Sequence, residues 1–169
     1  MKKILFTLLL LSQFEHVYAQ SRNNIWMLGR NPSANNVYGI NFNSGIADTF
    51  GLNRQMDFMF CDASICDTAG QLMFYTNGIS VQNRNHADMM NTNNFNPGTA
   101  TTVWNYGLRI QQACLILPVP ESDSLYYIFH ESGETVPANS TAPVNLSYSE
   151  VNMDLDGGLG SITAKKMYI

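Results

Sequence analysis

The sequence predicts an all-β fold on three observations. Short apolar and aromatic runs alternate with clusters of turn-forming residues through most of the chain. Patterns with helical spacing are scarce. Asn occurs 19 times, and Asn, Ser, Thr and Gly favour turns or compete with a helix for backbone hydrogen bonds. Since 45% of the residues are hydrophobic, the composition also argues against a disordered chain.

The apolar runs place the strands. We expect strands over residues 24–28, 38–42, 56–61, 71–76, 79–82, 108–117, 125–130, 146–154 and 161–169. Residues 86–91 predict one helical turn. Residues 91–106 predict a polar loop, and residues 131–144, which contain Pro137 and Pro143, predict a second loop.

Two predicted hairpins resemble each other. The first spans residues 63–78 around the turn Asp67-Thr68-Ala69-Gly70, and the second spans residues 114–130 around Glu121-Ser122-Asp123-Ser124. Each joins an apolar strand to an aromatic strand, and a spacing of about 40–50 residues with several strands per unit is typical of propeller blades. The similarity therefore favours a β-propeller over a β-sandwich, which is the alternative.

The second hairpin opens a fuller unit. Its strands 108–117, 125–130, 146–154 and 161–169 would form one antiparallel blade. We predict a partial β-propeller of two to three four-stranded antiparallel blades over residues 20–169. Closed propellers usually have at least four blades, so the prediction is a fragment of a longer chain that is incomplete at its C-terminal end.

Residues 1–19 have the pattern of a secretory signal peptide. Lys2 and Lys3 precede an apolar run over residues 4–11, and Val17-Tyr18-Ala19 matches a cleavage site. The run is much shorter than the roughly 20 apolar residues that span a bilayer, so we expect no transmembrane helix. The chain has a net charge of −4, which argues against a nucleic-acid partner. We predict a secreted protein or one on the outer cell surface.

The chain has three cysteines, Cys61, Cys66 and Cys114, and export permits disulfides. At most one intramolecular bridge can form. The pair Cys66–Cys114 is the candidate disulfide, with Cys61–Cys114 and three reduced, buried thiols as alternatives. The cysteine spacing lacks the paired pattern of a zinc module, so we expect no metal.

Other motifs favour structure over chemistry. Asp67 and Gly70 are typical of a hairpin turn, and Asp154-Leu155-Asp156-Gly157 lacks the ligand spacing of a calcium loop. Asp57, Asp62 and Asp67 are the only carboxylate cluster for a glycosidase-type pair. No nucleophile elbow occurs, and we therefore assign no catalytic residue and no cofactor.

Several segments resemble one family. They are residues 20–29 (QSRNNIWMLG), 41–42, 67–78 (DTAGQLMFYTNG), 81–86 (VQNRNH), 126–129 (YYIF), 148–153 and 157–160 (GGLG). Together they resemble the N-terminal region of secreted β-propeller-like proteins associated with PKD modules and with type IX secretion or gliding-motility sorting domains. The resemblance implies a large extracellular or surface-attached protein and implies no catalytic residues.

Aromatic side chains are the best candidates for ligand contact. Trp26, Trp104, Tyr106, Tyr126 and Tyr148 could stack on sugars or peptides, although aromatic residues also favour strand cores. Trp104, Asn105 and Tyr106 follow the polar loop, so we select these three as the ligand-binding candidates. We expect a non-enzymatic interaction module that binds an extracellular glycan or protein through loops at the blade ends. The alternatives are a carbohydrate-active enzyme or its accessory propeller, and a structural spacer.

Overall fold

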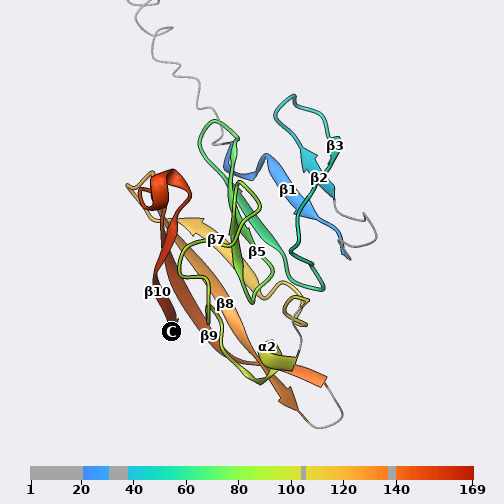
Figure 1. Ribbon diagram of the computed structural model, residues 1–169, viewed down its shortest axis with the longest axis vertical. Coiled ribbons are helices and arrows are strands. Elements are labelled where there is room, and N and C mark those ends of the chain that lie inside the picture. Colours follow the sequence, from blue (N-terminus) through green and yellow to red (C-terminus); the bar gives the residue numbers. More distant parts are fainter. Residues whose placement is uncertain (1–20, 31–37, 104–105, 137–139) are drawn as a thin grey trace, which may run out of the picture.

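The protein has an all-β architecture of three antiparallel sheets. The computed structural model describes residues 21–30, 38–103, 106–136 and 140–169 (Figure 1). In this part of the chain the sheets contain three, three and four strands, and none of them closes on itself. The all-β prediction is confirmed at this level. The predicted leader, residues 1–19, lies outside the described residues.

The first sheet is a short meander near the start of the described chain. It consists of β1 (Ile25–Leu28), β2 (Tyr38–Asn41) and β3 (Asp48–Gly51) in the order β1-β2-β3. A 3-10 turn over Ser21–Asn23 precedes it. The sequence did not predict β3, which is short and carries one large apolar side chain. The Phe50 ring covers Gly39, where a Cβ atom would lie 2.3 Å from that ring. The strand therefore depends on a contact with β2.

The second sheet contains the first predicted hairpin. It consists of β4 (Ala63–Cys66), β5 (Leu72–Thr76) and β6 (Val81–Asn83) in the order β4-β5-β6. The hairpin turn is built as expected, because one Asp67 carboxylate oxygen accepts hydrogen bonds from the backbone N–H groups of Ala69 and Gln71, both at 2.9 Å. Gly70 supplies the positive φ of +79° at the end of the turn.

The third sheet is the predicted four-stranded unit. Its strands are β7 (Cys114–Pro118), β8 (Leu125–Val136), β9 (Ser140–Asn152) and β10 (Ser161–Tyr168). They lie in the order β10-β9-β8-β7, so each strand pairs with its neighbour in sequence. Figure 1 shows β8 and β9 as the longest strands of the molecule. Between β9 and β10 lies the glycine-rich turn, which contains a 3-10 segment over Asp156–Gly158.

The predicted loop over residues 131–144 is wrong for its described residues, because β8 runs to Val136 and β9 begins at Ser140, while residues 137–139 lie outside the described part of the chain. Glu131 pairs with Leu146, and the ladder runs on to Gly133, which pairs with Pro143. The register shifts between Ser132 and Gly133. A proline lacks a backbone N–H, and an irregularity in the ladder accommodates it. Pro143 therefore does not end the strand.

The predicted strand over residues 56–61 is also wrong. Met56 and Phe58 are buried with the alternation typical of a strand, but the segment pairs with no neighbouring strand. Side chains satisfy two of its carbonyl groups instead. The Arg54 guanidinium donates to the Met56 carbonyl, and the Asn77 amide donates to the Asp57 carbonyl at 3.0 Å. The burial pattern is strand-like, while the hydrogen bonding is that of a buried loop.

Three further segments differ from their predicted secondary structure. Residues 108–113 form no strand, and β7 begins only at Cys114. Residues 86–91 contain turns and isolated bridges, without a helix. The predicted polar loop contains a short helix, α2 (Thr99–Val103).

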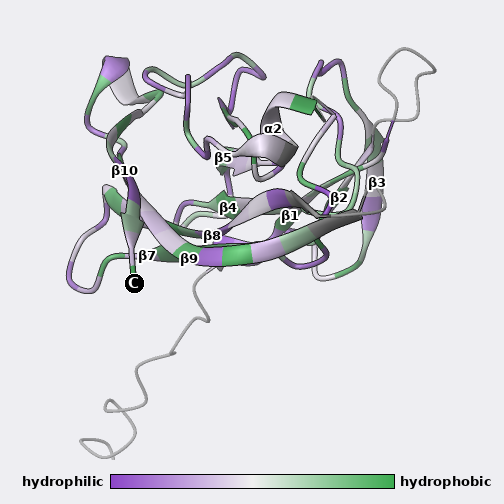
Figure 2. Cartoon of the chain, turned by 90° about the horizontal axis from the view of Figure 1, so that it is seen from below, coloured by the Kyte–Doolittle hydropathy of each residue, from purple (hydrophilic) through white to green (hydrophobic). Residues whose placement is uncertain are grey.

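The main core lies between the second and third sheets, which face each other (Figure 2). Phe74 of β5 packs edge-on against Tyr126 of β8, with ring centroids 5.4 Å apart, and both side chains are fully buried. A second cluster joins β1 to β5 through Met27, Met56, Phe58 and Tyr75. The three sheets thus pack in chain order through apolar contacts. In the described residues, no helix is long and apolar enough to span a bilayer.

Candidate functional site

The motif Phe74-Tyr75-Thr76-Asn77-Gly78 is a buried structural turn. Its first four side chains are at most 2% exposed. The Thr76 hydroxyl donates to the Ser80 carbonyl at 2.6 Å, and the Asn77 amide oxygen accepts from the backbone N–H groups of Ile79 and Ser80 at 3.1 Å. Each polar atom of the motif thus has a role in holding β5 to β6 and to the preceding loop. The most specific part of the family resemblance therefore lies in the core.

Two of the three predicted carboxylates, Asp57 and Asp62, lie near the buried Arg54. Arg54 is 2% exposed, and its guanidinium donates to the backbone carbonyls of Leu28, Gly29 and Met56. Burial raises the pKa of the Asp62 carboxyl, while the positive charge of Arg54 acts in the opposite direction. Burial likewise lowers the pKa of Arg54, against the opposing effects of Tyr75 and nearby carboxylates. This arrangement fits a cation that joins its own segment to the end of β1, and Asp67 is engaged in its own turn.

The three predicted ligand-binding residues are not brought together in the described structure. Trp104 and Asn105 lie outside the described residues. Tyr106 is 56% exposed and precedes Gly107, whose φ of +114° turns the chain toward the buried Leu108. Of the other aromatic candidates, Tyr126 is fully buried and donates its hydroxyl hydrogen toward the Met73 sulfur at 3.1 Å. The loop therefore provides one described ring for a ligand.

The structure places exposed apolar side chains on the outer surface of the third sheet. Along β8 the even-numbered residues Tyr126, Ile128 and His130 are fully buried, whereas Leu125, Tyr127 and Phe129 face the other way and are partly exposed. The same alternation occurs in β9, where Ser147, Ser149 and Val151 are buried. One side of this sheet contacts the second sheet, and nothing in the described residues covers the other side.

Strand pairing aligns these side chains in rows across the sheet. Leu117 of β7 lies opposite Tyr127, and Leu115 lies opposite Phe129, which pairs in turn with Tyr148. We call this surface the outer face and define it by Leu115, Leu117, Tyr127, Phe129, Leu146, Tyr148, Met167 and Ile169. The most exposed of them are Ile169 at 71%, Leu115 at 53% and Leu146 at 49%. Contiguous exposed apolar surface on this scale is typical of interaction sites.

Three rings form the centre of the outer face. Tyr127 and Tyr148 pack edge-on with centroids 5.4 Å apart, and Phe129 lies 6.1 Å from Tyr127 and 6.2 Å from Tyr148. These contacts between neighbouring rings hold the side chains in place before any partner arrives. The rings and Ile169 line an apolar hollow of about 170 Å³.

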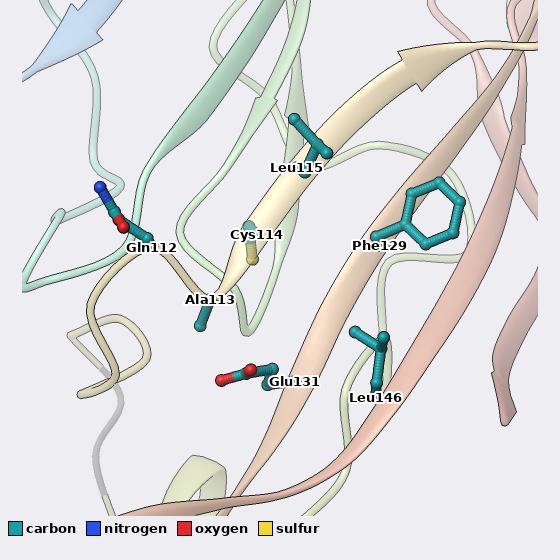
Figure 3. A pocket seen from close by; sticks show the side chains of 7 residues that line it. All are labelled: Gln112, Ala113, Cys114, Leu115, Phe129, Glu131 and Leu146. Carbon is teal, nitrogen blue, oxygen red and sulfur yellow. The ribbon is translucent and has the colours of Figure 1, made fainter. Parts of the chain in front are cut away.

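A second hollow lies beside the rings, toward the start of β7. It has a volume of about 260 Å³ and is lined by residues 112–115 together with Phe129, Glu131 and Leu146 (Figure 3). Leu115 and Phe129 contribute apolar walls, while the Glu131 carboxylate stands at the side next to Ala113. The two hollows share Phe129, so the outer face offers one continuous uneven apolar surface with a carboxylate at its edge.

One feature of the sequence indicates the outer face, although it did not enter the prediction of the strands. Residues 125–129 are an uninterrupted apolar and aromatic run, Leu-Tyr-Tyr-Ile-Phe. Strands covered on one side alternate polar and apolar residues, whereas continuous apolar runs are typical of strands covered on both sides. The run thus predicts that both faces of β8 are suited to packing, but not which one the rest of the chain leaves uncovered.

The cysteines lie in two different surroundings. Cys61 and Cys114 belong to one apolar cluster with Leu108 and Ala113, while Cys66 is fully buried against the backbone of Asn24 and Ile25. Burial raises the pKa of the Cys66 thiol to about 11. All three thiols are reduced in this structure. The neighbour of Cys114 is thus Cys61, and the candidate pair Cys66–Cys114 is not the one in contact.

In the described part of the chain, no three His, Cys, Asp or Glu side chains gather closely enough to hold an ion. Comparison with known proteins finds no matching family model, no matching curated protein and no matching solved structure. The resemblance to secreted propeller-like proteins therefore stays a prediction from the sequence.

Proposed function

We propose that this protein is a non-enzymatic extracellular interaction module that binds a protein partner through the outer face of its third sheet. The observation that carries the proposal is the apolar surface to which all four strands of that sheet contribute, with half-exposed leucines around three packed rings and the Glu150 carboxylate beside Tyr127. The sequence-based hypothesis placed recognition in loops at the blade ends. The outer face offers more apolar area on a more rigid support than the single described loop ring, Tyr106.

The chemistry of the outer face favours a protein over a glycan. Sugars are recognised by aromatic rings combined with polar groups that satisfy their hydroxyls, whereas Leu115, Leu117 and Leu146 offer no hydrogen bonds. The hollow that the three rings form with Ile169 is likewise lined by apolar surface. Aromatic anchors surrounded by aliphatic residues are typical of the buried centre of a protein interface. The nearby carboxylates of Glu131 and Glu150 favour a partner with basic groups around its own apolar patch.

We further propose that the partner presents an apolar β-sheet face. The inner side of the third sheet already packs in this way on the second sheet, and the three sheets follow one another in chain order as propeller blades do. In this hypothesis the three sheets are neighbouring blade-like units, and the outer face receives another unit of the same kind. The leader pattern in residues 1–19 supports export, and deletion of those residues should then keep the protein inside the cell.

A displayed library of β-hairpin peptides tests the binding surface. The library is selected on the purified chain and on the double variant Leu115→Lys/Leu146→Lys, which places two charges on the outer face. The matched control is Ile46→Lys/Leu155→Lys, because Ile46 and Leu155 are exposed apolar side chains elsewhere, at 71% and 41%. We expect hairpins with one apolar face to bind the wild-type and control proteins equally, and the outer-face variant at least about 10-fold more weakly.

Two results would contradict the proposal. The first is that no selected hairpin distinguishes the outer-face variant from the control. The second is that a glycan array reveals ligands whose binding depends on Tyr148 while no hairpin binds, which would identify the protein as a lectin. Thermal unfolding of all variants verifies folding, since exposed positions should change stability by no more than about 0.5 kcal/mol.

A further inference from the structure

Two cysteines from distant parts of the chain meet in the interior. Cys61 lies just before β4, and Cys114 is the first residue of β7. Both belong to the apolar cluster around Leu108 and Ala113, and a side-chain hydrogen bond with Cys61 is the first cause of the raised pKa of the Cys114 thiol. Cys61 is 1% exposed, whereas Cys114 is partly exposed and is one of the residues that line the hollow beside Phe129 (Figure 3).

We propose that Cys61 and Cys114 form a disulfide that links the second sheet to the third, and that Cys66 stays a free thiol. Cys61 and Cys114 pack in the same small apolar cluster, which brings their side chains near each other as a disulfide requires. Cys66 faces the other way, toward the backbone of Asn24 and Ile25 near the first sheet. The bond would close a loop from residue 61 to residue 114, which contains all of the second sheet and α2. This inference does not rest on the proposed binding function.

The reaction requires a disulfide-bearing oxidant, such as glutathione disulfide or a thiol–disulfide oxidoreductase of the exporting compartment. The more accessible Cys114 loses its proton and attacks one sulfur of the oxidant, which forms a mixed disulfide and releases one thiolate. Cys61 then loses its proton and attacks the Cys114 sulfur, which releases the second thiolate. Two electrons and two protons pass to the oxidant, and one S–S bond replaces two S–H bonds.

The environment of Cys114 also affects the rate of the first step. The hydrogen bond with Cys61, followed by burial, raises the pKa of the Cys114 thiol well above its usual range. Thiolate is the reactive form, so the raised pKa slows the attack on the oxidant at neutral pH. The rate of bond formation should therefore increase with pH through the neutral range.

Peptide mapping of the full chain tests the assignment. The reduced, purified protein is equilibrated in an oxidising mixture of glutathione and glutathione disulfide, alkylated under denaturing conditions, and digested with trypsin and a protease that cleaves before aspartate. The three cysteines then fall in separate peptides, 57–61, 62–66 and 110–122. We expect peptide 57–61 to be linked to peptide 110–122, and peptide 62–66 to carry the alkyl group on Cys66.

Single variants provide the matched controls. The Cys66→Ser protein should form the same link, while Cys61→Ser should form none. Oxidation should raise the thermal midpoint by roughly 10 °C in wild type and in Cys66→Ser, because a loop of about 50 residues is closed, and should leave Cys61→Ser unchanged. A link through Cys66, a link between two chains, or three alkylated cysteines after oxidation would each overturn the proposal. The disulfide is assigned by peptide mapping of the wild-type chain, so the assignment does not depend on whether the variants fold.

Discussion

Replacement of Asn77 by alanine tests whether the buried turn after β5 is held by one side chain. The Asn77 amide group donates to the Asp57 carbonyl at 3.0 Å and accepts from the backbone N–H groups of Ile79 and Ser80 at 3.1 Å. The side chain is 2% exposed, so water cannot replace these contacts without a change in the fold. The alanine variant would leave one carbonyl and two N–H groups without these partners.

The expected loss follows from the three hydrogen bonds. At about 1 kcal/mol for each bond, Asn77→Ala should lower the free energy of unfolding by about 3 kcal/mol. For a chain of this size the thermal midpoint should fall by roughly 6–12 °C. With a denaturant slope near 2 kcal/mol per molar urea, the urea midpoint should fall by about 1.5 M.

Urea unfolding followed by circular dichroism measures the change. The control is Asn152→Ala, which removes a single exposed hydrogen bond from the Asp154 N–H at 2.9 Å and should cost at most about 0.5 kcal/mol. If Asn77→Ala loses no more stability than Asn152→Ala, then the turn is held by backbone contacts alone and this reasoning is wrong.

Three further predictions concern buried groups. Burial, followed by the charge of Lys166, lowers the pKa of His130 to about 4, whereas a histidine in the unfolded chain titrates near about 6.5, so the folded state binds fewer protons. The stabilising effect of the neutral histidine is present above pH 6.5 and is lost toward pH 4. Between pH 7 and 5, the free energy of unfolding measured in urea should fall by about 2 kcal/mol more in wild type than in His130→Gln. Equal losses in the two proteins would refute this prediction. Gly78→Ala should lower the free energy of unfolding by about 3 kcal/mol, because φ is +85° and the new Cβ would lie 2.7 Å from the Leu108 Cβ. Gly45→Ala has a similar φ of +82° but nothing within 4 Å of the new Cβ, so it should lower the free energy of unfolding by only about 1 kcal/mol. Equal thermal midpoints of the two variants would contradict the role of the Leu108 contact. Arg54→Met should lower the free energy of unfolding by about 3 kcal/mol, since three backbone carbonyls lose their donor, and a loss below about 1 kcal/mol by urea unfolding would argue against that role.

The elements that the sequence predicted best are those built from neighbouring residues. The hairpin around Asp67 and Gly70 forms as expected, because its hydrogen bonds and its positive φ involve residues within the turn itself. The four strands expected to form one antiparallel unit do form one sheet, in which each strand pairs with the next one in sequence. In both cases the interactions that decide the structure are local, and the residue pattern contains them.

The errors occur where a distant residue supplies a partner. Residues 56–61 have the alternating burial of a strand, but the Arg54 and Asn77 side chains bind their carbonyls in place of a neighbouring strand. Residues 131–144 contain prolines that predicted a loop, but Pro143 lies next to an irregularity in the ladder that accommodates it. The cysteine pairing was left open for the same reason, because the neighbour of Cys114 depends on how two sheets pack.

By itself, the sequence determined that this protein is built from β-strands with polar turns, since the period-2 pattern and the turn residues act within a few positions. It also determined that β8 has two apolar sides, because residues 125–129 contain no polar interruption. Only the tertiary structure decided which side is buried. The inner side packs against β4–β6, and the described residues leave the outer face exposed, because contact between sheets depends on the arrangement of strands that lie far apart in the chain.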